Sequence, residues 1–443
     1  MVPNDQGRRR RWLSHGPPMT PETIAFFGNF GTGNLGNECT LQAIIQNTRR
    51  YVPVAKVVCI CPAPENVSRT HGVPAFQMSY RFGPASRVRR PENPVVRLVR
   101  RIAIRIPREL VEWVKAFRQL GGTRMLVMTG TGMLSDFGIG PLDLHYEILK
   151  WSVIAKVRGC KLLFVSVGAG PIAHPLSRWI VKAALSLADY RSYRDRFSQQ
   201  YLESIGFNAS KDHVYPDLVF SLAADGTPDA ADGHPRSKVS VVGIGLMDYY
   251  GEHRSPEDGE RIYQRYVDRL ARFAAWLLER GCSLRLLVGD LSYDLRVKRE
   301  LLAMLEAEGI KLDPERIIDE PLSSTQDLYS QLAQTDLVVA TRFHNVLLAL
   351  LLNKPVIALS YHDKVRALMI ECGLADYCED ATDLDVPSLI ARFESLDANA
   401  AVLRSALKER TDASRLALDE QYGEIFGGAQ PRRLSRARVG ASG

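Results

Sequence analysis

The chain has no long apolar run, no CxxC pair of cysteines and no cluster of metal-ligating side chains. A helix that crosses a membrane needs about 20 consecutive apolar residues, and no stretch of the 443 residues comes near that length. Its seven cysteines lie scattered at 39, 59, 61, 160, 282, 372 and 378, without a CxxC pair or a Cys/His zinc spacing. We therefore expect no membrane span, no metal site and reduced thiols, which is typical of a cytoplasmic protein.

Apolar residues are also missing after the basic start MVPNDQGRRRRW, so we expect no secretory signal peptide there. The excess positive charge of +7 is local. It concentrates in residues 1–20 and 427–443, which we predict to be disordered basic tails, and in a basic insertion at 81–118 with eleven Arg or Lys against three Glu. The overall composition, 46% hydrophobic and 24% charged, indicates a globular protein.

Short apolar runs alternate with amphipathic helical stretches along the chain. This βαβ rhythm predicts an α/β fold built from doubly wound parallel sheets. The rhythm is interrupted at AADGTPDAADGHPRSK, which is poor in large apolar residues, and we place a linker at 226–238. Two Rossmann-like domains, at 21–225 and 239–426, are predicted to face each other across a cleft lined by the carboxyl ends of their strands.

A glycine pattern follows the first predicted strand, with Gly31, Gly33 and Gly36 in the spacing GxGxxG. In dinucleotide-binding proteins such glycines bring backbone N–H groups to a pyrophosphate. The second predicted strand ends in CICP, however, without the acid that would bind a ribose. The other interpretation is an open loop, GNFGTGNLGNE, whose short polar side chains meet sugar hydroxyls; a simple helix cap at Asn37 stays equally open. The sugar-binding side chains would be Asn34, Asn37 and Glu38.

Two further strand ends carry small or charged residues. Gly130 and Gly132 follow the strand predicted at Arg124–Thr129, where glycine lets a ligand approach the backbone, although a tight turn also needs it. Arg194 follows a strand that ends at Tyr193, and its guanidinium could bind a carboxylate or phosphate through two nitrogens. The alternative for Arg194 is a structural ion pair with Asp195.

The segment Thr341-Arg342-Phe343-His344-Asn345 follows an apolar strand and leads into a wholly apolar helix. The start of a helix carries unpaired N–H groups and partial positive charge. Arg342, His344 and this helix start are therefore predicted to form a pocket for a small, highly charged anion. An imidazole can also donate or accept a proton near neutral pH. Lys364, after the next strand, is predicted to face the same crevice, or else to be an exposed helix residue.

Residues 95–106, VVRLVRRIAIRI, combine an apolar stripe with arginines at helical spacing. Such a basic amphipathic helix could lie on an anionic membrane, which would place the protein at the inner face of the plasma membrane. It could equally pack its stripe on the protein. Nucleic acid is not an expected partner, because no aromatic platform interleaves the basic residues.

The chain resembles the polysaccharide pyruvyl transferases. The resemblance rests on GNFGTGNLGNE, the glycines at 130–132, VSVGAGP, SYRDRFSQQYLESIGF, YPDLVFSL and TRFHNVLLALLLNKPVIALSYHDKVRALMIECGL. It departs where the family commonly has a run of glycines, at 129–132, and often Asp, at Asn37. The resemblance implies a fold like that of the two-domain GT-B glycosyltransferases, phosphoenolpyruvate as donor, a saccharide acceptor and no nicotinamide cofactor.

On this hypothesis the donor is bound by the C-terminal domain and the acceptor by the N-terminal one. The donor-binding residues are predicted to be Arg194, Arg342, Asn345 and Lys364. His344 would donate a proton, and Asp217 or His145 would accept one from a sugar hydroxyl. Two other functions stay open: a sugar-nucleotide glycosyltransferase of the same architecture, and a non-catalytic subunit of a polysaccharide assembly complex.

Overall fold

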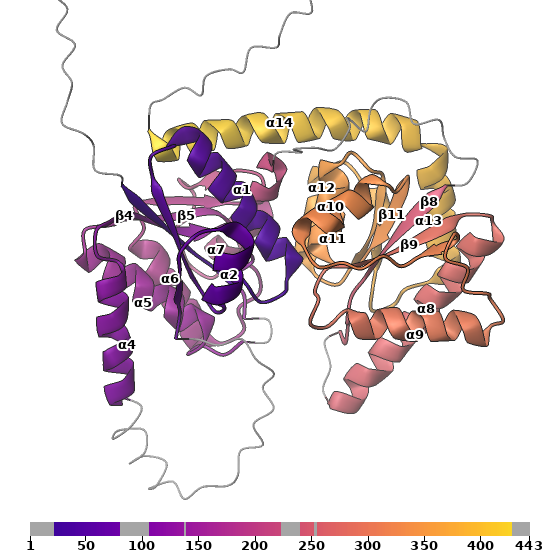
Figure 1. Cartoon of the computed structure of the whole chain (residues 1–443), viewed down its shortest axis with the longest axis horizontal. Helices are drawn as coiled ribbons and strands as arrows, with labels where there is room; N and C mark the ends of the chain where they lie inside the picture. The colour runs from indigo at the N-terminus through magenta and orange to yellow at the C-terminus, as the bar shows by residue number, and fades with distance from the viewer. Residues whose placement is uncertain (1–21, 80–105, 137–138, 223–239, 252–254, 428–443) are drawn as a thin grey trace, which may run out of the picture.

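The structure is a computed structural model, and it describes residues 22–79, 106–136, 139–222, 240–251 and 255–427. The linker predicted at 226–238 lies outside the described residues. So do the tails, except for Gly427, and residues 81–105 of the basic insertion. Figure 1 shows two α/β units side by side, as the alternating pattern predicted.

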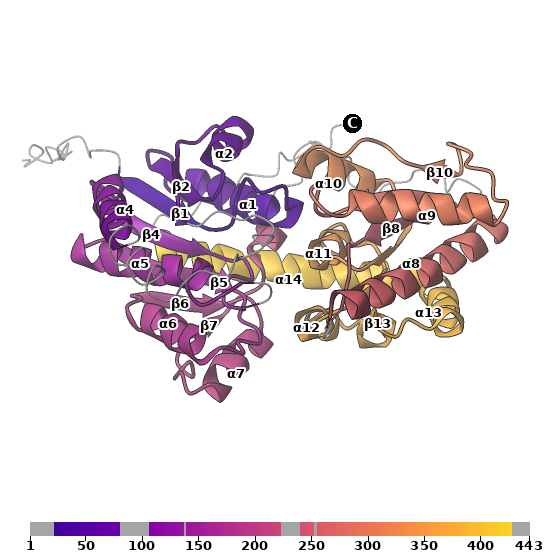
Figure 2. The same cartoon turned by 90° about the horizontal axis from the view of Figure 1, so that it is seen from below.

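The N-terminal domain is built on one parallel sheet of seven strands in the order β3-β2-β1-β4-β5-β6-β7. Figure 2 shows this order running from β2 near one edge to β7 near the other. The strands are β1 (Thr23–Phe27), β2 (Lys56–Cys61), β3 (Ala75–Gln77), β4 (Thr123–Thr129), β5 (Lys161–Val167), β6 (Tyr190–Tyr193) and β7 (His213–Val214). The helices are α1 (Leu35–Tyr51), α2 (Pro64–His71), α4 (Ile106–Gln119), α5 (Leu144–Val157), α6 (Pro175–Ser186), α7 (Arg196–Ser204) and the 3-10 turn η2 (Leu218–Ser221).

The C-terminal domain repeats the same architecture with six parallel strands in the order β10-β9-β8-β11-β12-β13. The strands are β8 (Val241–Leu246), β9 (Ser283–Val288), β10 (Ile317–Ile318), β11 (Leu337–Ala340), β12 (Val356–Ser360) and β13 (Cys378–Asp380). The helices are α8 (Pro256–Glu279), α9 (Leu295–Ala307), α10 (Thr325–Ala333), α11 (Phe343–Leu351), α12 (Asp363–Glu371), η3 (Ala375–Tyr377), α13 (Val386–Ala398) and α14 (Ala400–Phe426). In both sheets the strand order reverses beside the first strand, which is where doubly wound folds bind ligands.

Both faces of each sheet are covered, so the inner strands are apolar along their whole length. In the N-terminal domain, one face packs on α1 and η2, and the other packs on α4, α5 and α6. The outer face of the C-terminal sheet packs on α8, α9 and α13. The two inner faces share one continuous apolar core, to which α10, α11 and α12 contribute. The apolar run Val346–Leu351 of α11 is thus explained, because this helix also contacts α1, η2 and α14.

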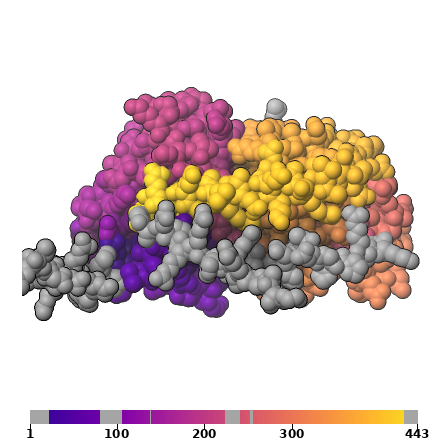
Figure 3. Space-filling view, turned by 90° about the horizontal axis from the view of Figure 1, so that it is seen from above, coloured from indigo at the N-terminus to yellow at the C-terminus, as the bar shows by residue number. Residues whose placement is uncertain are grey.

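Helix α14 joins the two domains a second time. It begins on the C-terminal domain and runs back along the N-terminal one (Figures 1 and 3). Asp419 pairs with Arg50 at 2.9 Å, and Gln421 donates to Ser192 at 2.6 Å. The last turns before 426, which the sequence pattern placed in the C-terminal domain, therefore pack on the N-terminal domain. No helix in the described part of the chain is long and apolar enough to cross a membrane.

Candidate active site

Helix α11 starts where β11 ends, at the interface between the domains. Arg342 occupies its N-cap position in an extended conformation and makes no side-chain hydrogen bond to the first turn. The leading N–H groups of α11 therefore keep their partial positive charge without a capping oxygen. By contrast, Asp195 caps α7 and His362 caps α12, both nearby in the same cleft.

The guanidinium of Arg342 is held by Asp294, which lies between β9 and α9. Its Nε donates to Asp294 Oδ2 at 2.9 Å, and its Nη2 donates to Oδ1 at 2.5 Å. The same carboxylate also accepts backbone N–H groups of Gly289, Asp290 and Asp248 at 2.8–3.0 Å. Burial alone would lower the pKa of Arg342, but Asp294 and Asp290 outweigh it and raise this pKa. The guanidinium of Arg342 is thus held in one position. It could bind a ligand through two nitrogens only by leaving Asp294.

His344 lies against the N-terminal domain. A methyl group added at Gly36, in the first turn of α1, would lie 1.9 Å from His344 Nδ1, so only glycine fits there. Burial lowers the pKa of His344 to about 3, and three cations act in the same direction. These are Arg194, Lys364 and Arg342. The buried Nε2 of His344 has no hydrogen-bond partner among the described residues.

Replacing Gly36 by alanine is expected to reduce turnover by roughly 100-fold while the domains remain folded. The helix itself tolerates alanine better than glycine, but the added methyl forces His344 and α1 apart, and small displacements at a reacting centre cost about that much. Steady-state kinetics together with thermal unfolding would check this. Gly423→Ala in α14, where an added methyl meets nothing within 4 Å, is the control. Full activity of Gly36→Ala would contradict a close approach of the domains at His344.

Arg194 and Lys364 approach α11 from different domains and meet at Phe343. The Arg194 guanidinium lies 4.3 Å from the centre of the Phe343 ring, and the Lys364 ammonium lies 5.9 Å from it. Arg194 is also paired with Asp195 at 3.4 Å and Asp217 at 3.3 Å. The ion pair with Asp195 that the sequence suggested as the alternative for Arg194 is therefore present, and binding of an anion by Arg194 stays a prediction. Lys364 has no carboxylate within salt-bridge distance among the described residues, which leaves its charge available to an anion.

Asn345 does not turn toward the interdomain surface. Its side chain is fully buried in the C-terminal domain beneath the ends of β8 and β9. A methyl group at Gly245 would lie 3.0 Å from its Nδ2, and one at Gly289 would lie 2.9 Å from its Oδ1. The structure thus places Asn345 behind the site, where it contacts the strand ends, rather than where a donor would be bound.

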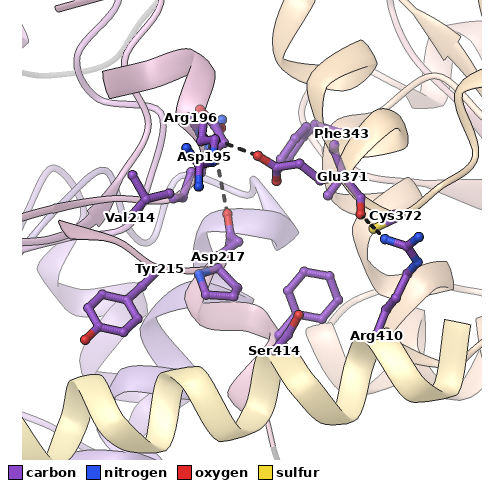
Figure 4. Close-up of a pocket in the computed structure, with 14 residues that line it drawn as sticks. Asp195, Arg196, Val214, Tyr215, Asp217, Phe343, Glu371, Cys372, Arg410 and Ser414 are labelled. Carbon is purple, nitrogen blue, oxygen red and sulfur yellow. Dashed lines mark hydrogen bonds and ion pairs between the residues drawn. The ribbon is translucent and has the colours of Figure 1, made fainter. Parts of the chain in front are cut away.

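A cavity of about 340 Å³ opens between the domains next to Phe343 (Figure 4). Asp217 lies on its wall, where it caps η2 and pairs with Arg194; burial raises the pKa of Asp217. Glu371, at the end of α12, accepts a hydrogen bond from the Arg196 N–H across the cleft at 3.4 Å. Burial and then the charge of Asp195 raise the pKa of Glu371 to about 7. The cavity thus carries carboxyl groups suited to proton transfer.

The glycine-rich loop predicted to bind the acceptor is an interdomain contact. Asn34 caps α1 by accepting from the Asn37 N–H at 3.2 Å, and it forms an antiparallel bridge with Asp290 of the other domain. Asn37 is therefore not the cap; its amide donates to the Asn29 carbonyl at 3.0 Å. Glu38 accepts from the Gly31 N–H at 2.6 Å and pairs with His71. These side chains shape the loop.

The glycines after β4 differ from each other in their surroundings. A methyl group at Gly130 would lie 2.7 Å from the Ser166 carbonyl oxygen, so this glycine is needed for packing. At Gly132 it would come no closer than 3.8 Å, to Arg194. Of the two glycines, Gly132 is thus the one that leaves space next to the Arg194 guanidinium.

His145 does not reach the cleft surface, which corrects its predicted role as a base. It is completely buried at the start of α5, and burial lowers its pKa. Neither of its ring nitrogens has a hydrogen-bond partner within the described ranges. Because no open surface adjoins the ring, a sugar hydroxyl cannot approach it in this structure.

Three residues of the site were not assigned roles from the sequence: Asp294, Glu371 and His362. His362 caps α12 through Nδ1, and burial followed by Lys364 lowers its pKa to about 4. A methyl group at Gly170 of the other domain would lie 3.4 Å from its ring. His362 stands two residues before Lys364. This closeness in sequence to a predicted donor-binding residue was the one signal that could have identified His362 as part of the site. Asp294, just before α9, and Glu371, at the end of α12, stand in sequence typical of helix ends and gave no signal.

No group of three His, Cys, Asp or Glu side chains that could hold a metal ion occurs within the described residues. A sequence model of the family described as polysaccharide pyruvyl transferase matches residues 34–363, from the glycine-rich loop to the start of α12. No curated protein sequence matches the chain.

Solved structures share the fold over most of the chain. A Listeria monocytogenes protein assigned as a UDP-N-acetylglucosamine 2-epimerase matches with a TM-score of 0.57 at 11% identity, over 93% of this chain and 98% of its own. The UDP-GlcNAc 2-epimerase from Neisseria meningitidis bound to UDP-GlcNAc gives 0.53 at 12%, over 90% and 99%. HepE from Anabaena, in complex with UDP and glucose, gives 0.52 at 14%, over 91% and 99%. At these identities the likeness shows the fold alone, and it confirms the GT-B-like pair of Rossmann-like domains.

Proposed function

This chain belongs to the polysaccharide pyruvyl transferase family, and from that premise we propose that it transfers a pyruvyl group from phosphoenolpyruvate to a sugar. The sugar would be part of a surface polysaccharide or exopolysaccharide, or of its lipid-linked precursor. One observation supports phosphoenolpyruvate as the donor. Arg194, Lys364 and Arg342, which come from two domains, all act electrostatically on His344 at the start of α11, and Nε2 of His344 has no hydrogen-bond partner among the described residues.

Phosphoenolpyruvate carries a phosphate and a carboxylate on a three-carbon skeleton, so its site must balance several negative charges. Lys364 supplies a positive charge without a carboxylate partner among the described residues, and the N–H groups of α11 add a positive dipole end. The charges of Arg342 and Arg194 are largely balanced by their carboxylate partners, so Lys364 and the start of α11 supply most of the positive charge for the donor. The proposal needs no cofactor besides this donor.

The reaction adds a proton to the methylene carbon of the donor and places positive character on C2. One sugar hydroxyl attacks C2 and loses its proton; a second hydroxyl of the same sugar then displaces phosphate and loses its own. One of the two released protons replaces the one given to carbon, and the other leaves with phosphate. A bound anion would counter the cations that depress the pKa of His344 and raise this pKa toward the range in which imidazole transfers protons. We assign His344 as the acid that protonates the methylene carbon of phosphoenolpyruvate.

The acceptor hydroxyls need a base within reach of the donor. Asp217 lies on the wall of the interdomain cavity, and its buried carboxyl has a raised pKa. Asp217 is paired with Arg194, which itself lies over Phe343. We therefore keep Asp217 as the proposed base and place the acceptor in this cavity, on the N-terminal side of α11.

Phosphoenolpyruvate is expected to raise the melting temperature of the purified protein, and UDP is not. Replacing Lys364 by alanine should weaken phosphoenolpyruvate binding roughly 10- to 100-fold, because a hydrogen bond to a charged group is lost. Thermal shift titration measures both. Lys311→Ala removes an exposed lysine of the same domain and serves as the control.

Turnover is tested by following phosphate release with a panel of cell-surface glycans and by detecting a pyruvate ketal on the product. Stabilisation by UDP but not by phosphoenolpyruvate would favour a sugar-nucleotide glycosyltransferase instead. Binding of neither ligand, with co-purification in an assembly complex, would favour a non-catalytic subunit.

A further inference from the structure

Helix α4 exposes most of its large apolar side chains to solvent. Five of them are between 38% and 61% exposed: Ile106, Leu110, Val111, Val114 and Phe117. Four recur at spacings of four, four and three residues, so they form one stripe along the helix. A stripe of this kind on a helix normally faces a core or a partner.

The opposite side of α4 is fixed to the N-terminal domain. Ala116 is buried in the core beneath the helix. Trp113 donates to the Tyr146 hydroxyl at 2.9 Å, and Glu109 accepts from Lys150 at 3.2 Å. The orientation of α4 is therefore set by contacts with α5, and its apolar stripe cannot turn inward. Figures 1 and 2 both show α4 at the end of the N-terminal domain that lies away from the C-terminal domain.

Basic side chains flank the apolar stripe. Arg118 lies one turn after Val114, Arg108 and Lys115 lie one turn from Val111, and Arg158 lies 4.3 Å from the centre of the Phe117 ring. Of the two acids of the helix, Glu109 pairs with Lys150 of α5 and Glu112 pairs with Lys115 on α4 itself, so Arg108, Arg118 and Arg158 supply the positive charge of this face. The face of α4 thus joins apolar surface to positive charge.

The sequence that leads directly into α4 strengthens this charge. Residues 80–105, which lie outside the described part of the chain, contain eight arginines and one glutamate. A second copy of the chain on the same face would bring Arg108 and Arg118 of α4 and Arg158 at the end of α5 close to the same residues of the partner, which opposes a symmetric dimer there. An anionic surface with an apolar interior fits both the stripe and the charge.

We propose that the exposed face of α4 docks on an anionic lipid bilayer. The apolar side chains enter the boundary between headgroups and acyl chains, and the flanking basic residues attract the anionic headgroups. This docking surface stands on the exposure and charge of α4 and does not depend on pyruvyl transfer. It extends the membrane contact predicted at 95–106, of which only Ile106 lies within the described residues.

Vesicle flotation tests the docking surface with the full-length protein. The wild type is expected to float with phosphatidylcholine–phosphatidylglycerol vesicles, much less with phosphatidylcholine alone, and less as salt is added. In the variant Leu110→Ser/Val114→Ser the bound fraction should fall roughly tenfold or more, because two apolar side chains are lost from the contact. The matched control is Val402→Ser/Leu416→Ser, which removes two exposed apolar residues from α14 and should float like the wild type.

Equal flotation of wild type and the α4 variant would overturn the proposal, as would equal binding to neutral and anionic vesicles. Sedimentation that shows a dimer in the wild type and a monomer in the α4 variant would also overturn it and assign the face to a second copy. All variants alter exposed side chains, so circular dichroism should show unchanged folding.

Discussion

Replacing His344 by glutamine is expected to lower kcat for pyruvyl transfer by about 10²- to 10⁴-fold, the contribution typical of a positioned proton donor. Glutamine keeps a polar side chain of similar reach, but it cannot carry a proton to the methylene carbon of phosphoenolpyruvate. Lys364, which is one of the cations that depress the pKa of His344 and is the proposed direct contact of the donor, is unchanged in this variant. We therefore expect the KM for phosphoenolpyruvate to change much less than kcat.

Initial-rate kinetics of phosphate release check this expectation, with thermal unfolding measured in parallel. His213→Gln is the control, because His213 is an exposed residue of β7 whose side chain is 48% accessible. Wild-type kcat in His344→Gln, with unchanged stability, would remove His344 from the chemistry. A rise in KM alone would reassign it to donor binding.

Replacing Asp294 by asparagine is expected to lower the free energy of unfolding by about 3–5 kcal/mol, the usual cost of leaving a buried charge without its partner. Asp294 is fully buried, and it holds the Arg342 guanidinium together with three backbone N–H groups. An amide offers one acceptor oxygen and adds an N–H that faces other donors. Urea unfolding of the purified protein measures the loss.

Two comparisons identify the cause of that loss. Asp319→Asn breaks an exposed pair with Lys298 and should cost no more than about 1 kcal/mol. The double variant Asp294→Asn/Arg342→Met removes both charges, so it should be more stable than Asp294→Asn alone. If the double variant were instead the less stable one, an uncompensated charge on Arg342 would not be the reason.

Local sequence patterns were sufficient for the architecture. Continuous apolar runs predicted buried parallel strands, and the break after β7 separated two domains of the same kind. The strands β3 and β13 were not predicted, because three residues are too few to show a period. The position of Arg342 and His344 at a strand-to-helix turn was also predicted, since both residues and the helix start are neighbours in the chain.

The partners of these residues could not be predicted. Arg342 meets Asp294 because the strand order places β9 and β11 on either side of β8, so the loops that follow them converge. His344 meets Gly36 because the domains close on each other. His145 is near the edge of a predicted loop in sequence, yet the fold buries it completely.

The sequence by itself determined the fold class, the two domains and the group of cations at one strand-to-helix turn, because helical and strand periods and the residues at a turn are local properties. Only the tertiary structure decided which charges are neutralised, which imidazole faces the cleft and which glycines permit contact. Those outcomes depend on how sheets and domains pack, and packing joins residues that no local period relates.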